Sequence, residues 1–246
     1  WVVVIPIVGA LIIGVMARYG SMAIRGHGIP EVMERVLHGE SRIPARVMVL
    51  KPISAAVAIG TGGPFGAEGP IIATGGAIGS LLGQIVHMSA DERKTLLAAG
   101  AAAGMSATFA SPISAVLLAV ELLLFEYRAR SLIPVALASA AAMSVRIAFR
   151  GPGTDFAIGT LSVAHGEALV FYVLIGAIVG GIAAYITRAT YAIEDLFEHL
   201  PVHWALWPAI GAVFLGLIGW WQPRVLGIGY ENITAIINGE MVGKAL

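Results

Sequence analysis

The stretch GTGGPFGAEGP at residues 60–70 combines a single carboxylic acid, Glu68, with glycines and prolines that interrupt a helix. Residues 52–90 carry no other formal charge and are apolar enough to enter a bilayer. An acid at that depth costs about 3 kcal/mol or more, and such residues usually face a water-filled path or a partner. Broken backbone at membrane depth is tolerated only where protein buries it or where it lines a cavity. The stretch therefore predicts that Glu68 lies on a transport route.

Two other interpretations of Glu68 remain open, a structural ion pair and a side chain that extends to the membrane interface. Residues 52–92 contain no lysine or arginine, so an ion pair would need a partner that is distant in sequence. An acid at the mouth of an anion site can occupy the site as a carboxylate and leave it when protonated. A gate of this kind responds to pH.

Composition places the chain in the membrane. Its 246 residues are 58% hydrophobic and 12% charged, with a mean hydropathy of +0.86, whereas soluble domains carry about 25% charge. The formal net charge is zero, which argues against nucleic acid as a partner. Cysteine is absent, so disulfides, thiol catalysis and thiolate metal sites are excluded.

The chain is expected to be a piece of a longer protein. Trp1 begins inside an apolar run without a basic region before it, and the last residues end without a terminal feature. No cleavable signal peptide is evident. Apolar segments, several of them near the roughly 20 residues of a spanning helix, lie at 1–17, 44–60, 70–88, 95–124, 131–149, 168–187 and 204–221.

Three segments share one design, in which small residues and a proline precede an apolar run. Proline is favoured in the first turn of a helix, so the sequence predicts helix starts at Ile29–Pro30, Gly69–Pro70 and Ser111–Pro112. A helix start exposes free N–H groups and the positive end of the dipole. Convergence of such starts would form an anion site without a buried lysine. Ordinary helix boundaries in a glycine-rich bundle are the alternative.

Other candidate residues carry weaker signals. The glycines spaced by four, at 75, 79, 83, 100 and 104, predict close helix packing rather than chemistry. Glu121 is either a proton relay or the point where a helix reaches water. His199 and His203 flank Pro201, which favours a loop between helices over a metal site.

The ordered motifs resemble those of the CLC chloride channels and chloride/proton exchangers. Gly26-His27-Gly28-Ile29-Pro30 is similar to the GSGIP motif, and Gly66-Ala67-Glu68-Gly69-Pro70 is similar to the G(K/R)EGP motif. The run from Gly100 to Glu121 resembles the helix pair that follows, and Leu226–Tyr230 resembles a loop early in the second half of the family. The resemblance spans nearly the whole chain.

This resemblance implies an all-α integral membrane protein, a bundle of tilted and re-entrant helices with an inverted repeat. Residues 1–246 would form a partial transmembrane domain, with the first structural half at about 1–150 and an incomplete second half at about 165–246. The expected partners are chloride or a similar anion, membrane lipid and a second copy of the chain in a homodimer. The expected location is the plasma (inner) membrane. No cofactor, metal or enzymatic activity is implied.

The resemblance also implies roles for individual residues. Glu68 would be the gate and outer proton acceptor. The residues shaping the anion site around it would be Gly66, Ala67, Gly69 and Pro70, and those forming the inner lip would be Gly26, His27, Gly28, Ile29 and Pro30.

Three departures from the family pattern bear on the mechanism. His27 replaces a serine that contacts the anion, and Ala67 replaces a basic residue. Leu122 occupies the position of an inner proton-transfer glutamate, next to Glu121. Leucine cannot relay protons, so the sequence favours passive chloride conduction of the voltage-gated channel type, gated by Glu68. The alternatives are a chloride/proton exchanger and, in another class, a membrane packing subunit without transport.

Overall fold

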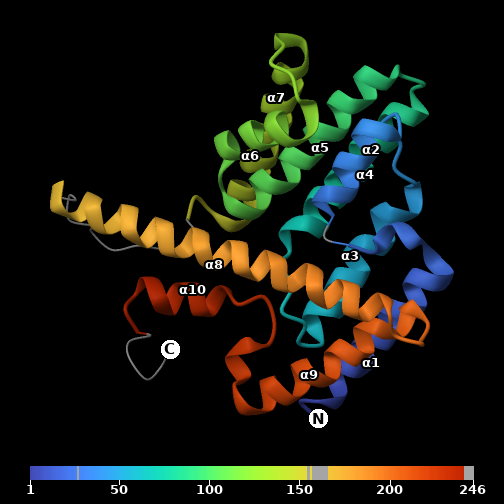
Figure 1. Ribbon diagram of the computed structural model, residues 1–246. Helices are drawn as coiled ribbons and strands as arrows, with labels where there is room; N and C mark the ends of the chain where they lie inside the picture. Colours follow the sequence, from blue (N-terminus) through green and yellow to red (C-terminus); the bar gives the residue numbers. More distant parts are fainter. Residues whose placement is uncertain (27, 154–155, 157–165, 241–246) are drawn as a thin grey trace.

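The computed structural model describes residues 1–26, 28–153, 156 and 166–240, and every regular element in these ranges is a helix (Figure 1). The prediction of an all-α protein is therefore confirmed. The longer helices are α1 (Val4–Val15), α2 (Ile29–His38), α3 (Ala45–Gly60), α4 (Glu68–Ile85), α5 (Ala90–Phe109), α6 (Pro112–Ala119), α7 (Ala129–Arg150), α8 (Gly166–Glu198), α9 (Trp207–Trp221) and α10 (Tyr230–Ile237). Short helical turns occupy Met16–Gly20, Met22–Ile24, Val120–Leu124, Trp204–Leu206 and Pro223–Val225.

The three predicted helix starts are confirmed, since α2, α4 and α6 begin at Ile29, Glu68 and Pro112. The apolar run 95–124 is divided in two because Ala110, at φ +53°, adopts a left-handed conformation that ends α5. Proline then opens α6, where its missing N–H has no intrahelical partner to lose.

Helices α4 and α5 form the closest contact of the bundle, through the glycines that the sequence assigned to packing. A Cβ atom added to Gly75 would collide with the carbonyl oxygen of Gly100, and one added to Gly79 would collide with that of Leu96. The two backbones therefore approach more closely than any larger residue permits. The packing interpretation of this glycine stripe is confirmed.

The buried core continues from α5 onto α6 and α7. Leu97, Val135 and Leu124 are almost fully buried there, at 0%, 0% and 1% exposure. Hydroxyl groups join the helices inside this core, since Ser106 Oγ donates to the Ser139 carbonyl at 2.8 Å and Ser139 Oγ donates to the Pro112 carbonyl at 2.9 Å. Each buried hydroxyl thus has a partner, as low-polarity surroundings require.

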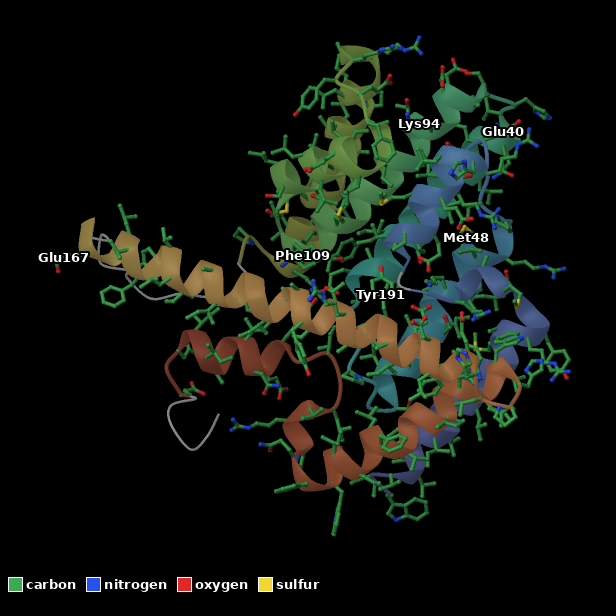
Figure 2. All side chains as sticks on the ribbon, viewed as in Figure 1. Glu40, Met48, Lys94, Phe109, Glu167 and Tyr191 are labelled. Atoms are coloured by element: carbon green, nitrogen blue, oxygen red, sulfur yellow. The ribbon has the colours of Figure 1, made fainter. Side chains whose placement is uncertain are left out.

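The turn between α2 and α3 is attached to α4 and α5 by polar contacts. Ser80 Oγ donates to the Ser41 carbonyl at 2.6 Å and accepts from the Ile43 N–H at 3.0 Å. The buried Arg93 side chain donates from Nε to the Glu40 carbonyl at 2.9 Å. Figure 2 shows Glu40 and Lys94 at this same end of the molecule. These contacts attach the turn after α2 to the C-terminal half of α4 and to the beginning of α5.

Helices α1 and α9 lie side by side, so the last third of the chain packs against its beginning (Figure 1). A Cβ atom at Gly216 would contact the Cα of Val3 at 2.6 Å, which makes this contact close. The loop that ends α8 contains His199 and His203, as predicted. His203 Nδ1 accepts a hydrogen bond from the Ala205 N–H at 3.2 Å, within that loop.

Among the described residues, the segments Ala129–Arg150, Gly166–Glu198 and Trp204–Trp221 are long and apolar enough to cross a bilayer. None of the 33 residues of α8 is buried within the chain, although the helix is strongly apolar. Figure 2 shows its side chains extending into open space along its length, with Glu167 at one end. This surface therefore requires lipid or further protein around it.

Candidate functional site

The candidate site lies where the loop 61–67 enters α4. Ala67 is the N-cap, and its carbonyl accepts the first helical hydrogen bond, from the Ile71 N–H at 3.0 Å. Glu68 and Pro70 consequently stand in the first turn, where N–H groups lack intrahelical partners. Glu68 is half-buried, and its side chain folds back over Gly66, because a Cβ atom at Gly66 would collide with Glu68 Oε2. Glycine at position 66 thus leaves room for the carboxyl group.

The start of α2 contacts the start of α4 directly. Gly28, buried and at φ +103°, lies so close to Gly69 that an added Cβ atom would collide with the Gly69 carbonyl. Its N–H donates to Glu31 Oε2 at 2.6 Å, which caps α2. Of the residues predicted to form the inner lip, Ile29 and Pro30 open α2 and Gly26 lies in the loop before it, whereas His27 lies outside the described residues. The structure therefore brings together the two motif segments that the sequence selected.

The third predicted helix start, that of α6, is bonded to α7. The carbonyl of Pro112 accepts the hydrogen bond from Ser139 Oγ on α7. Helix α6 packs on α5 and α7. A direct contact is thus found between the starts of α2 and α4, and the start of α6 is bonded to α7.

A buried lysine that the sequence analysis did not assign holds the loop before α2. Lys51, only 3% exposed on α3, donates from Nζ to the carbonyls of Ile24 and Gly26, each at 2.9 Å, and to that of Arg25 at 3.4 Å. The sequence contained a signal for this residue, since Lys51 is the only charged residue within the apolar helix α3 beyond its first turn.

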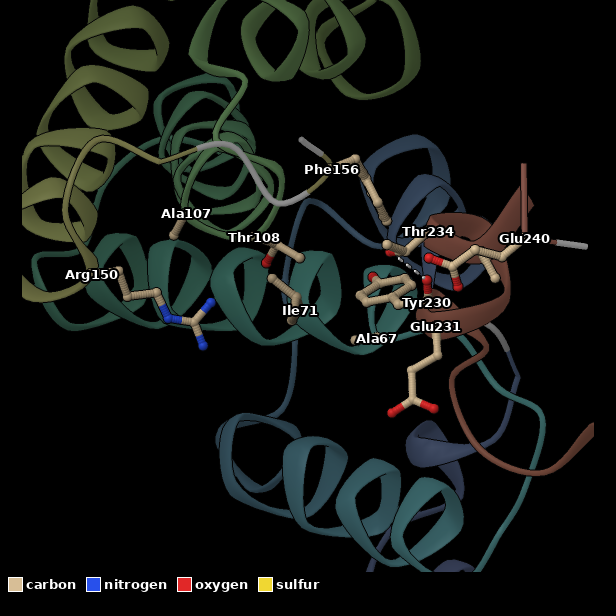
Figure 3. Close-up of a pocket in the computed structure, with 11 residues that line it drawn as sticks. Ala67, Ile71, Ala107, Thr108, Arg150, Phe156, Tyr230, Glu231, Thr234 and Glu240 are labelled. Carbon is tan, nitrogen blue, oxygen red and sulfur yellow. Dashed lines mark hydrogen bonds between the residues drawn. The ribbon is translucent and has the colours of Figure 1, made fainter. Parts of the chain in front are cut away.

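A cavity of about 700 Å³ adjoins the start of α4 (Figure 3). Ala67 and Ile71 of α4 and Thr108 of α5 line one part of it, and Tyr230 and Glu231 of α10 line another. The Tyr230 hydroxyl donates to Glu68 Oε1 at 2.9 Å, so the carboxyl group is bonded to a residue that lines this cavity. In the described part of the chain, no ion pair involves Glu68. The ion-pair interpretation of this acid therefore finds no support there.

Comparison with known proteins identifies the family. The profile described as "Voltage gated chloride channel" matches residues 8–246. This chain belongs to the voltage gated chloride channel (CLC) family. The assignment by motif is confirmed, and the protein is an integral membrane protein.

The proteins of the CLC family that are similar to this chain include one named as an exchanger and one named as a channel. The H(+)/Cl(-) exchange transporter ClcA of Cronobacter sakazakii is 31% identical over 90% of this chain and 49% of its own length. The chloride channel protein CLC-f of Arabidopsis thaliana is 25% identical over 96% of this chain and 31% of its own length. The chain thus spans about half the length of the bacterial relative.

Solved structures confirm the CLC fold. A slow cyanobacterial Cl-/H+ antiporter superposes with a TM-score of 0.83 at 20% identity, covering 95% of this chain and 56% of that one. Coverage of little more than half agrees with an incomplete inverted repeat. The predicted fold class, an all-α bundle of the CLC type, is therefore confirmed.

The residue at the position where the sequence predicts an inner proton-transfer acid is apolar. Leu122 lies in the helical turn Val120–Leu124 that extends α6, and it packs against the buried core. Its neighbour Glu121 is exposed on the surface of the described chain. Neither side chain provides a titratable group inside this part of the bundle.

Proposed function

We propose that this chain forms part of an anion transporter that exchanges chloride for protons, with Glu68 as the gate and outer proton acceptor. The observation that carries the proposal is the position of Glu68. Glu68 stands in the first turn of α4, whose start contacts the start of α2, and its carboxyl group accepts a hydrogen bond from Tyr230, which lines a cavity. Free N–H groups and helix dipoles there favour an anion. A carboxylate can occupy such a site, and protonation removes its charge.

The names of the relatives favour exchange over the passive channel that the sequence suggested. The bacterial relative at 31% identity is named as an H(+)/Cl(-) exchange transporter. The channel remains the second candidate, because Leu122 supplies no proton-transfer group at the inner position. In an exchanger, protons would have to reach Glu68 by a route that avoids Leu122.

The surrounding organisation is proposed on the same basis. The first structural half would end near residue 150. The second half would begin near residue 165, which lies outside the described residues. The anion-lining backbone would come from Gly26, Gly28, Ile29 and Pro30 of the inner lip and from Gly66, Ala67, Gly69 and Pro70 around the gate, with His27 at the position that affects selectivity. Chloride would be the transported ligand, without a cofactor, in a homodimer in the plasma membrane. The protein would act as a transporter and not as an enzyme.

The test is chloride efflux from proteoliposomes that contain the full-length protein, with simultaneous recording of external pH. An exchanger gives a pH change coupled to chloride flux, and a channel gives flux without one. The Glu68→Gln variant is expected to retain chloride movement and to lose at least 90% of the coupled proton movement. Glu194→Gln, on exposed α8, serves as the matched control. Proton coupling that persists in Glu68→Gln, or the absence of any flux in the wild type, would overturn the proposal.

A further inference from the structure

The Tyr230 hydroxyl reaches Glu68 from the other end of the chain. It donates a hydrogen bond to Glu68 Oε1 at 2.9 Å, across 162 positions of sequence. Tyr230 is the first residue of α10, and its ring lines the cavity beside α4 (Figure 3). This phenol is therefore positioned to act on the carboxyl group assigned here as the gate.

Several contacts hold the phenol in this position. The Gly227 N–H donates to the Gly62 carbonyl at 3.1 Å, which ties the loop before α10 to the loop before α4. Gly229 adopts φ +77°, a left-handed conformation that turns the chain into α10. The ring of Phe156 meets the Tyr230 ring edge-on, with centroids 5.8 Å apart and planes at 82°. The hydroxyl thus approaches Glu68 from a backbone that is joined to the same loop.

The strength of the hydrogen bond between Tyr230 and Glu68 depends on the charge of the carboxyl group. A phenol O–H donates more strongly to an ionised carboxylate than to a neutral acid, because hydrogen bonds to charged groups are the stronger ones. Contact with Tyr230 therefore holds an ionised Glu68 side chain at the start of α4 more strongly than a neutral one. Protonation weakens the contact and frees the side chain to move.

We propose that Tyr230 is a positioning residue that retains ionised Glu68 in the closed position and so sets the pH at which the gate opens. The inference rests on the proposed function of Glu68. It goes beyond that function because it assigns the control of the gate to the beginning of the second structural half.

Other charged groups lie near the pair and are left unchanged by the tests below. Arg150, Glu231 and Glu240 line the same cavity. Glu31 caps the start of α2, and Lys51 holds the loop before it. Their fields act on Glu68 whether or not the phenol is present, so removal of one hydroxyl isolates the contribution of Tyr230.

The decisive variant is Tyr230→Phe in the full-length protein, which removes the hydroxyl and retains the ring that meets Phe156. Chloride flux in proteoliposomes is measured over a range of pH. Without the donor, the ionised carboxylate is retained less strongly in the closed position, so the midpoint of flux against pH should move upward by about 1 pH unit. Tyr191→Phe, an exposed tyrosine on α8, should leave the midpoint unchanged. An unchanged or lower midpoint in Tyr230→Phe would overturn the inference.

A double variant separates the gate from general effects on the fold. In the Glu68→Gln background, Tyr230→Phe should produce no further change in the pH profile, because the acid on which the hydroxyl acts is gone. An equal shift in both backgrounds would show that Tyr230 acts elsewhere. If Glu68→Gln loses proton coupling but Tyr230→Phe does not shift the midpoint, the role of Tyr230 is wrong and the proposed function stands. If Glu68→Gln keeps its proton coupling, the proposed function fails first.

Infrared difference spectroscopy tests the contact without altering Tyr230. Full-length protein is labelled with ring-deuterated tyrosine, and spectra of the wild type and Glu68→Gln are compared. A carboxylate acceptor perturbs the phenol C–O–H band more than an amide does. The difference spectrum between the wild type and Glu68→Gln should therefore show a shifted tyrosine band as well as the loss of the carboxylate band. A difference spectrum with the carboxylate band alone would contradict the contact.

Discussion

At the scale of single residues, the site depends on positions where a side chain is absent. Gly66 leaves room for the Glu68 carboxyl group, and Gly28 allows the starts of α2 and α4 to touch. The conformation at Gly28, φ +103°, is one that residues with a Cβ atom rarely adopt. Both glycines thus support Glu68 through space and backbone geometry, without contributing a functional group.

Gly28→Ala is expected to separate the two helix starts. The added methyl group would collide with the Gly69 carbonyl, and the left-handed backbone conformation adds about 1 kcal/mol. We expect chloride flux in proteoliposomes to fall at least tenfold. Gly176→Ala on α8 is the control, since a methyl group there meets nothing within 4 Å. Flux equal to that of the wild type in Gly28→Ala would show that the contact is dispensable.

At the scale of helices, local sequence signals decide where each element begins. The N-cap Ser89 and Glu92 form a reciprocal pair at the start of α5, with Ser89 Oγ donating to Glu92 Oε2 at 2.7 Å. The Ser89 hydroxyl and then its backbone N–H hold the pKa of Glu92 below its ordinary value of 4.5. The cap lies at the polar turn that separates α4 from α5, the helices of closest contact.

This cap predicts a pH dependence of stability. Because the folded pKa of Glu92 is lowered, the stabilisation is present above the ordinary value of 4.5 and is lost as pH falls through the folded pKa. Ser89→Ala should therefore lower the thermal midpoint in detergent at pH 7 by about 2 °C, and by less at pH 3. Ser144→Ala, an exposed serine within α7, is the control. If Ser89→Ala lowers the thermal midpoint as much at pH 3 as at pH 7, Glu92 makes no contribution.

At the scale of the whole molecule, the described chain leaves a large apolar surface uncovered. Helix α8 has no buried residue, while α4, α5, α6 and α7 share one core. The bacterial exchanger is roughly twice as long as this chain, as the 49% coverage of its length indicates. The exposed face of α8 is thus available to lipid and to the remainder of a CLC protein.

Ile182→Lys tests this assignment at the middle of α8, where Ile182 is 52% exposed. A lysine near the centre of a spanning helix raises the free energy of insertion by about 3 kcal/mol. We expect the membrane-inserted fraction of the full-length protein, measured by alkaline extraction, to decrease severalfold. Ile182→Leu should insert as the wild type does. Equal insertion of both variants would place this face of α8 in contact with water.

The sequence by itself determined the features that depend on neighbouring residues and on composition. Apolar content predicted the membrane, glycine and proline predicted the starts of α2, α4 and α6, and the order of motifs predicted the family. Glu68 could be selected because a single charge in an apolar run is costly wherever the run folds. These signals are local, so they can be recognised in the sequence without knowledge of the packing.

Only the tertiary structure decided which distant groups meet. It joined Gly28 to Gly69, brought the Lys51 ammonium to the loop before α2, and placed the Tyr230 hydroxyl on Glu68. It also bonded the start of α6 to α7, through Ser139 Oγ and the Pro112 carbonyl. Such contacts follow from helix packing and loop closure over many residues, which no local pattern in the sequence encodes.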